Sequence, residues 1–183
     1  MKSFQLNEKT KSFLAEYQLF EDDLIQQVQL QHRLELVAAF GIQKGMRVLE
    51  IGCGQGDTTV AIADAAGESG SVVAIDIASP DYGAPLTLGQ ATERIKKSSL
   101  GERIDFHFEM DFDFFETPIP FDVAVLSHCS WYFKELEDLL KYFKKLVDWQ
   151  NIYVLQIGTS ISPAFLSVPT FVQFPFWHCI LTP

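Results

Sequence analysis

The sequence predicts an α/β fold, in which three layers form around a doubly wound and mostly parallel β-sheet. Helical and strand patterns alternate along the chain, which is the order that builds such a sheet. The predicted strands include short, continuous apolar runs, as expected when helices cover both faces of the sheet. With 183 residues, of which 48% are hydrophobic and 21% charged, the chain fits one globular domain with a full core.

The first predicted helix follows a pair of aspartates. Asp22 and Asp23 can cap its N-terminus, and Gly41 suits the position just after its C-terminus. Between them, apolar residues recur at steps of four, three and three, which places them on one face of a helix. These residues are Leu30, Leu34, Val37 and Phe40.

The other predicted elements alternate up to residue 157. Strands are predicted at Met46 to Ile51, Ser71 to Ile77, Arg103 to Phe108, Phe121 to Ser127 and Asn151 to Ile157. Helices are predicted at Thr58 to Ala66, Thr87 to Ser99 and Lys134 to Leu146, with Gly67 to Gly70 as a turn. In the last of these helices the apolar side chains form an inward face and the lysines face outward.

A glycine-rich turn separates the first predicted strand from the helix that follows it. Gly52, Gly54 and Gly56 alternate there with other residues, and glycine permits positive φ values and close approach of a ligand to the backbone. The spacing excludes a phosphate loop of the nucleotide triphosphatase kind, since no lysine stands near Gly56. A dinucleotide loop would need a third glycine where Asp57 stands, and this carboxylate would repel a pyrophosphate. The turn therefore favours a ligand without phosphate.

This turn resembles the first motif of the class I S-adenosylmethionine-dependent methyltransferases, which reads apolar-apolar-Glu/Asp-x-Gly-x-Gly-x-Gly. Glu50 and the three glycines occupy its defining positions, and Cys53 is a small side chain inside it. The resemblance spans Leu24 to Gly158 and implies a Rossmann-like methyltransferase fold with S-adenosyl-L-methionine as cofactor. This cofactor is a sulfonium cation without phosphate, so Asp57 is compatible with it. Glu50 would accept from the methionine ammonium, directly or through water, or else cap the amides of the turn. The alternative is a glycine turn that binds nothing.

The resemblance also implies which residues contact the rest of the cofactor. Asp76, at the end of the second predicted strand, would accept from the ribose hydroxyls with Ile77 beside it, whereas the alternative is a turn or capping aspartate. Asp111 resembles the family's aspartate that accepts from the adenine amino group, and Phe112 is the apolar neighbour that covers the ring. Asp113 is a rival for the role of Asp111.

The end of the fourth predicted strand is expected to meet the reacting centre. By resemblance, the backbone of Ser127 and His128 lies against the methionine part of the cofactor, and Trp131 and Tyr132 face the methyl acceptor. The segment has neither the Asn/Asp-Pro-Pro-Tyr/Phe pattern of amine-methylating subfamilies nor the paired Asp and Asn ligands of metal-dependent catechol enzymes. This favours a small-molecule acceptor and no metal ion.

His128 is the candidate general base, because it is the histidine at the carboxyl end of a strand. It would take a proton from a hydroxyl or an acidic carbon of the acceptor, during in-line displacement of the methyl group. The alternative is a packed or hydrogen-bonded histidine. His32, on the first predicted helix, could approach the site from above, whereas His107 and His178 are expected to be structural or surface residues.

Charge and composition restrict the classes of substrate and the cellular location that are expected. The net charge of −10 provides no basic stripe for phosphates, which disfavours a nucleic-acid substrate. Charged residues interrupt the N-terminal apolar residues, so no signal-peptide core is expected, and no apolar run reaches the roughly 20 residues that span a bilayer. Cys53, Cys129 and Cys179 are odd in number and far apart, which predicts reduced thiols in a cytoplasmic protein.

The C-terminus departs from the resemblance. The sequence divides into an N-terminal extension at 1–21, the cofactor-binding methyltransferase domain at 22–158 and an atypical tail at 159–183, rich in proline and aromatic residues. Because prolines resist central strands, the C-terminal hairpin that closes the sheet in this family is expected to be missing or replaced. The strand at Asn151 to Ile157 would then be an exposed edge, which predicts a homodimer through this edge or a poorly soluble chain.

Two other functions remain open. A non-catalytic remnant could keep the cofactor site, or only the fold, and act as an interaction module through the exposed edge. An NAD-dependent oxidoreductase would share the strand, the glycines and Asp76, but Asp57 argues against it.

Overall fold

The computed structural model describes residues 5–20, 23–129, 132–149, 153–157, 171–174 and 178–181. Its helices are α1 (Glu8–Tyr17), α2 (Leu24–Ala39), α3 (Asp57–Ala66), α4 (Leu88–Lys96) and α5 (Leu136–Asp148), with short 3-10 turns η1 (Gly101–Arg103) and η2 (Phe112–Phe114). Its strands are β1 (Arg47–Ile51), β2 (Ser71–Ile75), β3 (Ile104–His107), β4 (Val123–Ser127), β5 (Tyr153–Ile157), β6 (Phe171–Phe174) and β7 (His178–Leu181).

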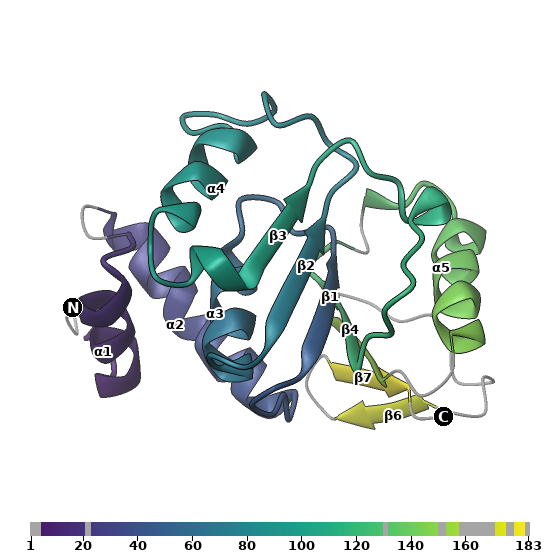
Figure 1. Cartoon of the computed structure of the whole chain (residues 1–183), viewed down its shortest axis with the longest axis horizontal. Coiled ribbons are helices and arrows are strands. Elements are labelled where there is room, and N and C mark those ends of the chain that lie inside the picture. Colours follow the sequence, from purple (N-terminus) through teal and green to yellow (C-terminus); the bar gives the residue numbers. More distant parts are fainter. Residues whose placement is uncertain are drawn as a thin grey trace.

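A sheet of seven strands, in the order β3-β2-β1-β4-β5-β7-β6, runs through the described part of the molecule (Figure 1). The strands from β3 to β5 are parallel to one another, whereas β7 is antiparallel to both β5 and β6. Chain order reverses at β1, which has β2 on one side and β4 on the other. In open α/β sheets, ligands bind beyond the carboxyl ends of the strands at such a switch point.

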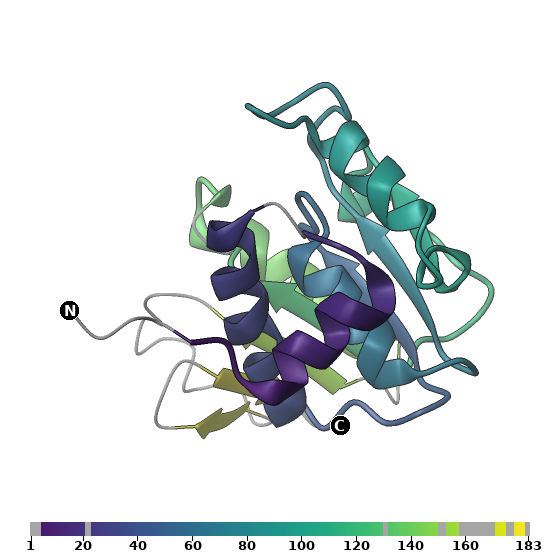
Figure 2. The ribbon, with the colours of Figure 1, turned by 90° about the vertical axis from the view of Figure 1, so that its left-hand side faces the viewer.

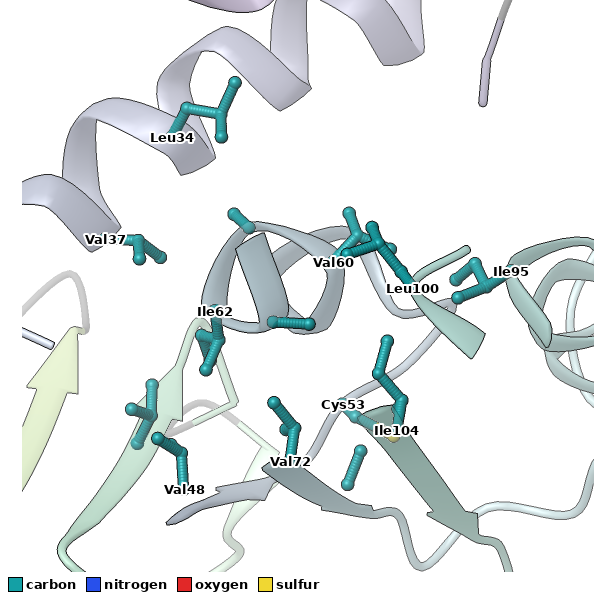
Figure 3. Close-up of a cluster of buried hydrophobic side chains, with 14 of the residues drawn as sticks. Leu34, Val37, Val48, Cys53, Val60, Ile62, Val72, Ile95, Leu100 and Ile104 are labelled. Carbon is teal, nitrogen blue, oxygen red and sulfur yellow. The ribbon is translucent and has the colours of Figure 1, made fainter. Parts of the chain in front are cut away.

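Alternate residues of the central strands build two separate cores. On one face, Val48 and Val72 pack with apolar side chains of α2, α3 and α4 (Figure 3). On the other face, Leu49 and Val73 pack with α5. The offset of one residue between the two sets is the pleat of a β-strand, whose side chains alternate between faces. The three-layer, doubly wound α/β fold is therefore confirmed, and Figure 1 shows α2 and α3 on one side of the sheet and α5 on the other.

Helix α1, which the sequence analysis did not predict, adds to the first of these cores. Asn7 caps it by accepting the backbone N–H of Thr10 at 2.9 Å, and Phe13 and Tyr17 are buried. The hydroxyl of Tyr17 donates to Oδ1 of Asp64 in α3 at 2.9 Å. Figure 2 shows α1 alongside α2, so the described part of the N-terminal extension packs against the domain.

The elements predicted between residues 23 and 157 are all present, with ends that differ by a few residues. Asp23 accepts the N–H groups of Ile25 and Gln26 and so caps α2, while Asp22 lies outside the described residues. Gly41, with a φ of 70°, follows the C-terminus of α2. No helix of the described ranges is both long enough and apolar enough to cross a membrane.

The C-terminal segment corrects the sequence analysis. The hairpin that was expected to be missing or replaced is present as the short antiparallel pair β6 and β7. Because Ile180 of β7 pairs with Leu155 of β5, the prediction that β5 is an exposed edge is wrong. Pro169, Pro175 and Pro183 fall outside the strand bounds, so they remove no donor from the ladder. The reason for expecting a homodimer through this edge is thereby removed.

Candidate functional site

The glycine turn between β1 and α3 lies at the switch point of the sheet. Gly52, Gly54 and Gly56 have φ values of 77°, 54° and 89°, in a region that side chains with a Cβ rarely adopt. A Cβ on Gly52 would lie 2.6 Å from the Cβ of Cys129, and one on Gly56 would lie 2.7 Å from Cδ1 of Ile95. A Cβ on Gly54 would meet no atom of the described residues within 4 Å. The outer two glycines therefore serve packing, and Gly54 faces open space where a ligand can reach the backbone.

Asp76 fixes this turn against the end of β2. Its Oδ2 accepts the N–H of Gly54 at 2.8 Å, and its Oδ1 accepts the N–H of Ala78 at 2.9 Å. A carboxylate has about four lone-pair sites, so both oxygens retain capacity for a further donor. Ile77, the next residue, is 68% exposed. The side chain of Ile77 is therefore accessible to a ligand that Asp76 holds.

Asp111 reaches the same edge of the sheet from the loop after β3. The N–H of Met110 donates to the carbonyl oxygen of Asp76 at 3.0 Å, which joins the two loops. Oδ1 of Asp111 accepts both the N–H of Asp113 at 2.9 Å and the hydroxyl of Tyr142 at 2.7 Å. Both bonds use Oδ1, so Oδ2 is the oxygen through which Asp111 could meet a ligand. Asp113 itself is exposed.

The predicted contact between the Phe112 ring and a ligand is wrong. Phe112 is only 1% exposed, and its ring packs edge-on against Tyr142 and Trp149, with centroid distances of 5.0 and 5.3 Å. Nζ of Lys145 lies 5.0 Å from the centre of the same ring. The physical reason is the turn η2, which directs Phe112 into the core on the α5 side of the sheet and leaves Phe114 exposed.

Glu50 and Cys53 lie beneath the turn and not on its open side. Glu50 is 1% exposed, and its Oε2 accepts the hydroxyl of Thr59 at 2.5 Å. Burial raises the pKa of Glu50 to about 8, although the bond from Thr59 and the charge of Arg33 act in the opposite direction. Cys53 is a free thiol that belongs to the core (Figure 3). Both side chains support the turn, and the Glu50 carboxyl is not exposed to a ligand in this structure.

The carboxyl end of β4 brings Ser127 and His128 together with Arg33 of α2. Nδ1 of His128 lies 2.9 Å from Oγ of Ser127, and Nη1 of Arg33 lies 2.6 Å from Nδ1 and 3.0 Å from Nε2. A guanidinium only donates, so the ring nitrogen that binds it accepts. Burial lowers the pKa of His128 to about 4, and the charges of Arg33 and His32 add to this effect. His128 is therefore a neutral imidazole at neutral pH.

Arg33 is a residue of this cluster that the sequence analysis missed. Burial lowers the pKa of Arg33, whereas the charges of Asp57 and Glu50 raise it. Burial also raises the pKa of Asp57, and Arg33 opposes this shift. The signal that could have found Arg33 is its place between Leu30 and Leu34 of the apolar stripe, where a cation is not expected.

The residues predicted to face the acceptor are placed only in part. Trp131 lies outside the described residues. The N–H of Tyr132 donates to the carbonyl oxygen of Cys129 at 3.0 Å, and its side chain is 75% exposed. A side chain with this exposure belongs to the rim of a site and not to its floor.

The other histidines differ in their distance from this centre. The ring of His32 lies 6.1 Å from that of His128, so α2 does bring it near. His107 lies apart, with Nε2 2.9 Å from Oδ2 of Asp105. His178 begins β7, and its side chain lies outside the described part of the chain. Among the described residues, no group of three or more His, Cys, Asp or Glu could hold a metal ion.

Comparison with known proteins decides the family. A family model described as a methyltransferase domain matches residues 48–150, which is more than half of the chain and runs from β1 past α5. The chain belongs to this methyltransferase family. The resemblance to the class I S-adenosylmethionine-dependent methyltransferases is thereby confirmed, and S-adenosylmethionine is the cofactor of this class.

The chain has relatives in fungi and bacteria. It is 31% identical over 122 residues to the methyltransferase phomM from Diaporthe leptostromiformis, a match that covers 56% of this chain and 32% of that protein. It is 38% identical to a cyclopropane-fatty-acyl-phospholipid synthase-like protein from Lactobacillus casei, with a TM-score of 0.73, over 85% of this chain and 57% of that one. The chain therefore spans about a third of the first relative and somewhat more than half of the second.

A methyltransferase of lower identity shares the fold. The S-adenosylmethionine-dependent methyltransferase from Geobacter sulfurreducens, solved in complex with S-adenosyl-L-homocysteine, has a TM-score of 0.51 and 19% identity, and the match covers 72% of this chain and 51% of that one.

Proposed function

We propose that this methyltransferase moves a methyl group from S-adenosylmethionine to a small-molecule acceptor by in-line displacement. One observation carries the proposal. The backbone of Gly54 faces open space at the switch point of the sheet, and the carboxylate of Asp76 holds its N–H. A backbone surface without side chains, beside a carboxylate at the carboxyl ends of the strands, suits the ribose and the adjacent chain of an adenosine ligand.

The residues present fit S-adenosylmethionine. Asp76 would accept from the ribose hydroxyls, Ile77 would contact one face of the adenine, and Asp111 would accept from the adenine amino group through Oδ2. The backbone at Ser127 would lie along the methionine part. Asp57, in the first turn of α3, agrees with a ligand that brings no phosphate to this helix N-terminus.

The bound cofactor supplies a methyl group that its positive sulfur activates. The chain has to hold the acceptor in line, exclude water and receive a proton. We propose His128 for the proton, through the ring nitrogen that accepts from Arg33 in this structure and that Arg33 has to release first. Because its pKa is about 4, it is a weak base. It therefore suits an oxygen acceptor, whose oxygen becomes strongly acidic once methylated, better than an amine acceptor.

Charge and cysteine chemistry support a small acceptor in a reducing compartment. A net charge of −10 is unfavourable for binding nucleic acid. Cys53 and Cys129 are free and buried, which agrees with the cytoplasmic location that we propose. The alternative of an interaction module is not favoured, because β7 pairs with the edge of β5 on which that module would depend.

Calorimetric titration with S-adenosylmethionine and S-adenosylhomocysteine tests the proposal. Gly54→Ala places a Cβ in the open space at a φ of 54°, and we expect at least about a 10-fold loss of affinity, since overpacking a close contact costs about 1–3 kcal/mol. Gly41→Ala is the matched control. Gly41 has a φ of 70°, and a Cβ there would also meet no described atom within 4 Å, but it lies at the far end of α2.

Two results would contradict the proposal. A folded wild type that binds neither compound would exclude the cofactor site. Equal losses of affinity in both glycine variants would show that backbone strain, and not access to Gly54, causes the effect. NAD serves as the competing ligand, and its binding in place of S-adenosylhomocysteine would favour the oxidoreductase.

A further inference from the structure

Arg33 carries a partly buried positive charge without an anionic partner in the described structure. None of the ion pairs of the described residues, defined by N···O distances up to 4.0 Å, includes Arg33. Its Nε is buried and has no hydrogen-bond partner. Its Nη1 meets the ring of His128, which is neutral. Nε of the guanidinium is therefore removed from water, and the described residues provide no acceptor for it.

This arrangement is costly. A donor that loses water without gaining an acceptor destabilises the folded state, and more so when it belongs to a charged group. Asp57 and Glu50 attract Arg33 from a longer distance, yet burial raises the pKa of both of these carboxyls. Burial therefore weakens both carboxyls as counter-charges for Arg33. A buried polar atom that stays unsatisfied at a candidate site requires a reason, and an absent ligand is one.

We propose that Arg33 binds a carboxylate that a ligand brings into the site. Nε and the adjacent Nη group of a guanidinium form a planar fork that matches the two oxygens of a carboxylate. The fork lies at the carboxyl end of β4, beside Ser127 and His128. This is where the cofactor and the acceptor are proposed to meet, so the inference rests on the proposed function.

Two ligands could bring this group. One is the cofactor, through the carboxylate at its methionine end, and the other is a methyl acceptor that carries a carboxylate. In both cases a single negative charge matches the single positive charge of Arg33, which a phosphate dianion would exceed.

Binding of a carboxylate would also act on His128. Arg33 now donates to the ring and helps to keep it neutral. When a carboxylate takes the guanidinium, its negative charge offsets that of Arg33, and the pKa of His128 rises. The site would then become more basic as the ligand binds, which a purely structural arginine would not cause.

The first experiment compares two ligands by calorimetry. S-adenosylhomocysteine carries the carboxylate, whereas 5′-methylthioadenosine has the same adenosine and sulfur without the amino-acid end. For Arg33→Gln, we expect at least about a 10-fold loss of affinity for S-adenosylhomocysteine and an unchanged affinity for methylthioadenosine. Arg94→Gln, on the exposed face of α4, is the matched control and should change neither.

The second experiment follows Arg33 and His128 by NMR. In the wild type, S-adenosylhomocysteine should shift the Nε–H resonance of Arg33 and raise the pKa of His128 above about 4, whereas methylthioadenosine should do neither. If only an acceptor brings the carboxylate, S-adenosylhomocysteine will leave both unchanged, and acetate added to that complex will produce both changes. In that case acetate should no longer raise the pKa of His128 in the Arg33→Gln variant.

The outcomes are separable. Equal affinity of wild type and Arg33→Gln for S-adenosylhomocysteine, together with no response of Arg33 to acetate, would overturn the inference while leaving the cofactor site intact. A wild type that binds neither adenosine compound would overturn the proposed function and this inference with it. Removal of a buried unpaired charge should not lower Tm, so a melting curve confirms that the variant is folded.

Discussion

At the scale of single residues, the carboxyls of Asp76, just after β2, and of Glu50, in the neighbouring strand β1, have opposite surroundings. Asp76 is partly exposed, and its two oxygens accept the N–H groups of Gly54 and Ala78. Glu50 is buried, and the hydrogen bond from Thr59 does not offset the loss of water, so its pKa rises to about 8. The first carboxyl is placed where a ligand can reach it. The second is arranged to stay neutral under the turn.

The Glu50 carboxyl should make stability depend on pH. The folded protein binds its proton up to about pH 8, whereas the unfolded chain releases it at the ordinary value of 4.5. Its contribution is therefore complete below pH 4.5 and is lost as pH rises toward 8, with a slope of about 1.4 kcal/mol per pH unit at most. Glu50→Gln keeps an acceptor for Thr59 and should remove this slope. Denaturant titrations at about pH 5 and about pH 8 measure it.

Glu102→Gln, at an exposed position before β3, serves as the control and should keep the wild-type slope. If the wild type and Glu50→Gln lost stability in parallel between these pH values, Glu50 would not be the buried acid that the geometry indicates.

At the scale of elements, helix α5 fixes the loop that carries Asp111. Nζ of Lys145 donates to the carbonyl oxygens of Phe112, Asp113 and Phe115 at 2.9, 2.9 and 2.8 Å. One turn earlier in the helix, the hydroxyl of Tyr142 donates to Asp111. The helix therefore does more than cover the sheet, because it sets the position of a carboxylate proposed to read the adenine.

Removal of the Lys145 contacts should loosen this loop. Lys145→Met keeps most of the apolar stem but removes the three donated bonds. We expect a loss of about 1–3 kcal/mol in the free energy of unfolding, since bonds from a charged donor are among the stronger ones. We also expect weaker binding of methylthioadenosine. Lys141→Met, on the exposed face of the same helix, should leave both quantities nearly unchanged, and equal effects of the two substitutions would exclude a specific role for Lys145.

At the scale of the whole molecule, the order of strands decides which backbone remains unpaired. β7 lies between β5 and β6 and pairs with both. Within the described residues, the apolar strand β5 is thus an internal strand, and the free edge on that side moves to β6. This is the arrangement that lowers the tendency to pair with another chain.

A proline in β7 should weaken its pairing with β5 and so increase the tendency of β5 to pair with another chain. Ile180 pairs with Leu155 on one side and with Val172 on the other, and Ile180→Pro removes a donor in the middle of the sheet. We expect aggregation or dimers by gel filtration and light scattering. Phe171→Pro, at the first position of the edge strand β6, is the matched control and should remain as the wild type. A monomeric, soluble Ile180→Pro variant would contradict the role of β7.

Most of the fold up to β5 could be predicted from the sequence, because the relevant signals are local. A strand buried on both faces has to be apolar, a helix N-terminus needs a capping side chain such as Asp23, and a positive φ selects glycine. Two elements were missed because the signals that define them are not local. Helix α1 is polar on average, and its buried residues Phe13 and Tyr17 have meaning only against α2 and α3. The hairpin of β6 and β7 is hidden by the neighbouring prolines.

The sequence by itself determined the layered α/β fold, the glycine turn and the acid after β2, since these depend on spacing along the chain. Only the tertiary structure decided which side of each residue faces the site. It directed Phe112 into the core and Glu50 beneath the turn. It also brought Arg33 of α2 to His128, which follows β4 and lies 95 positions further along the chain. The physical reason is that burial and the pairing of charges depend on contacts between distant elements, which no local pattern records.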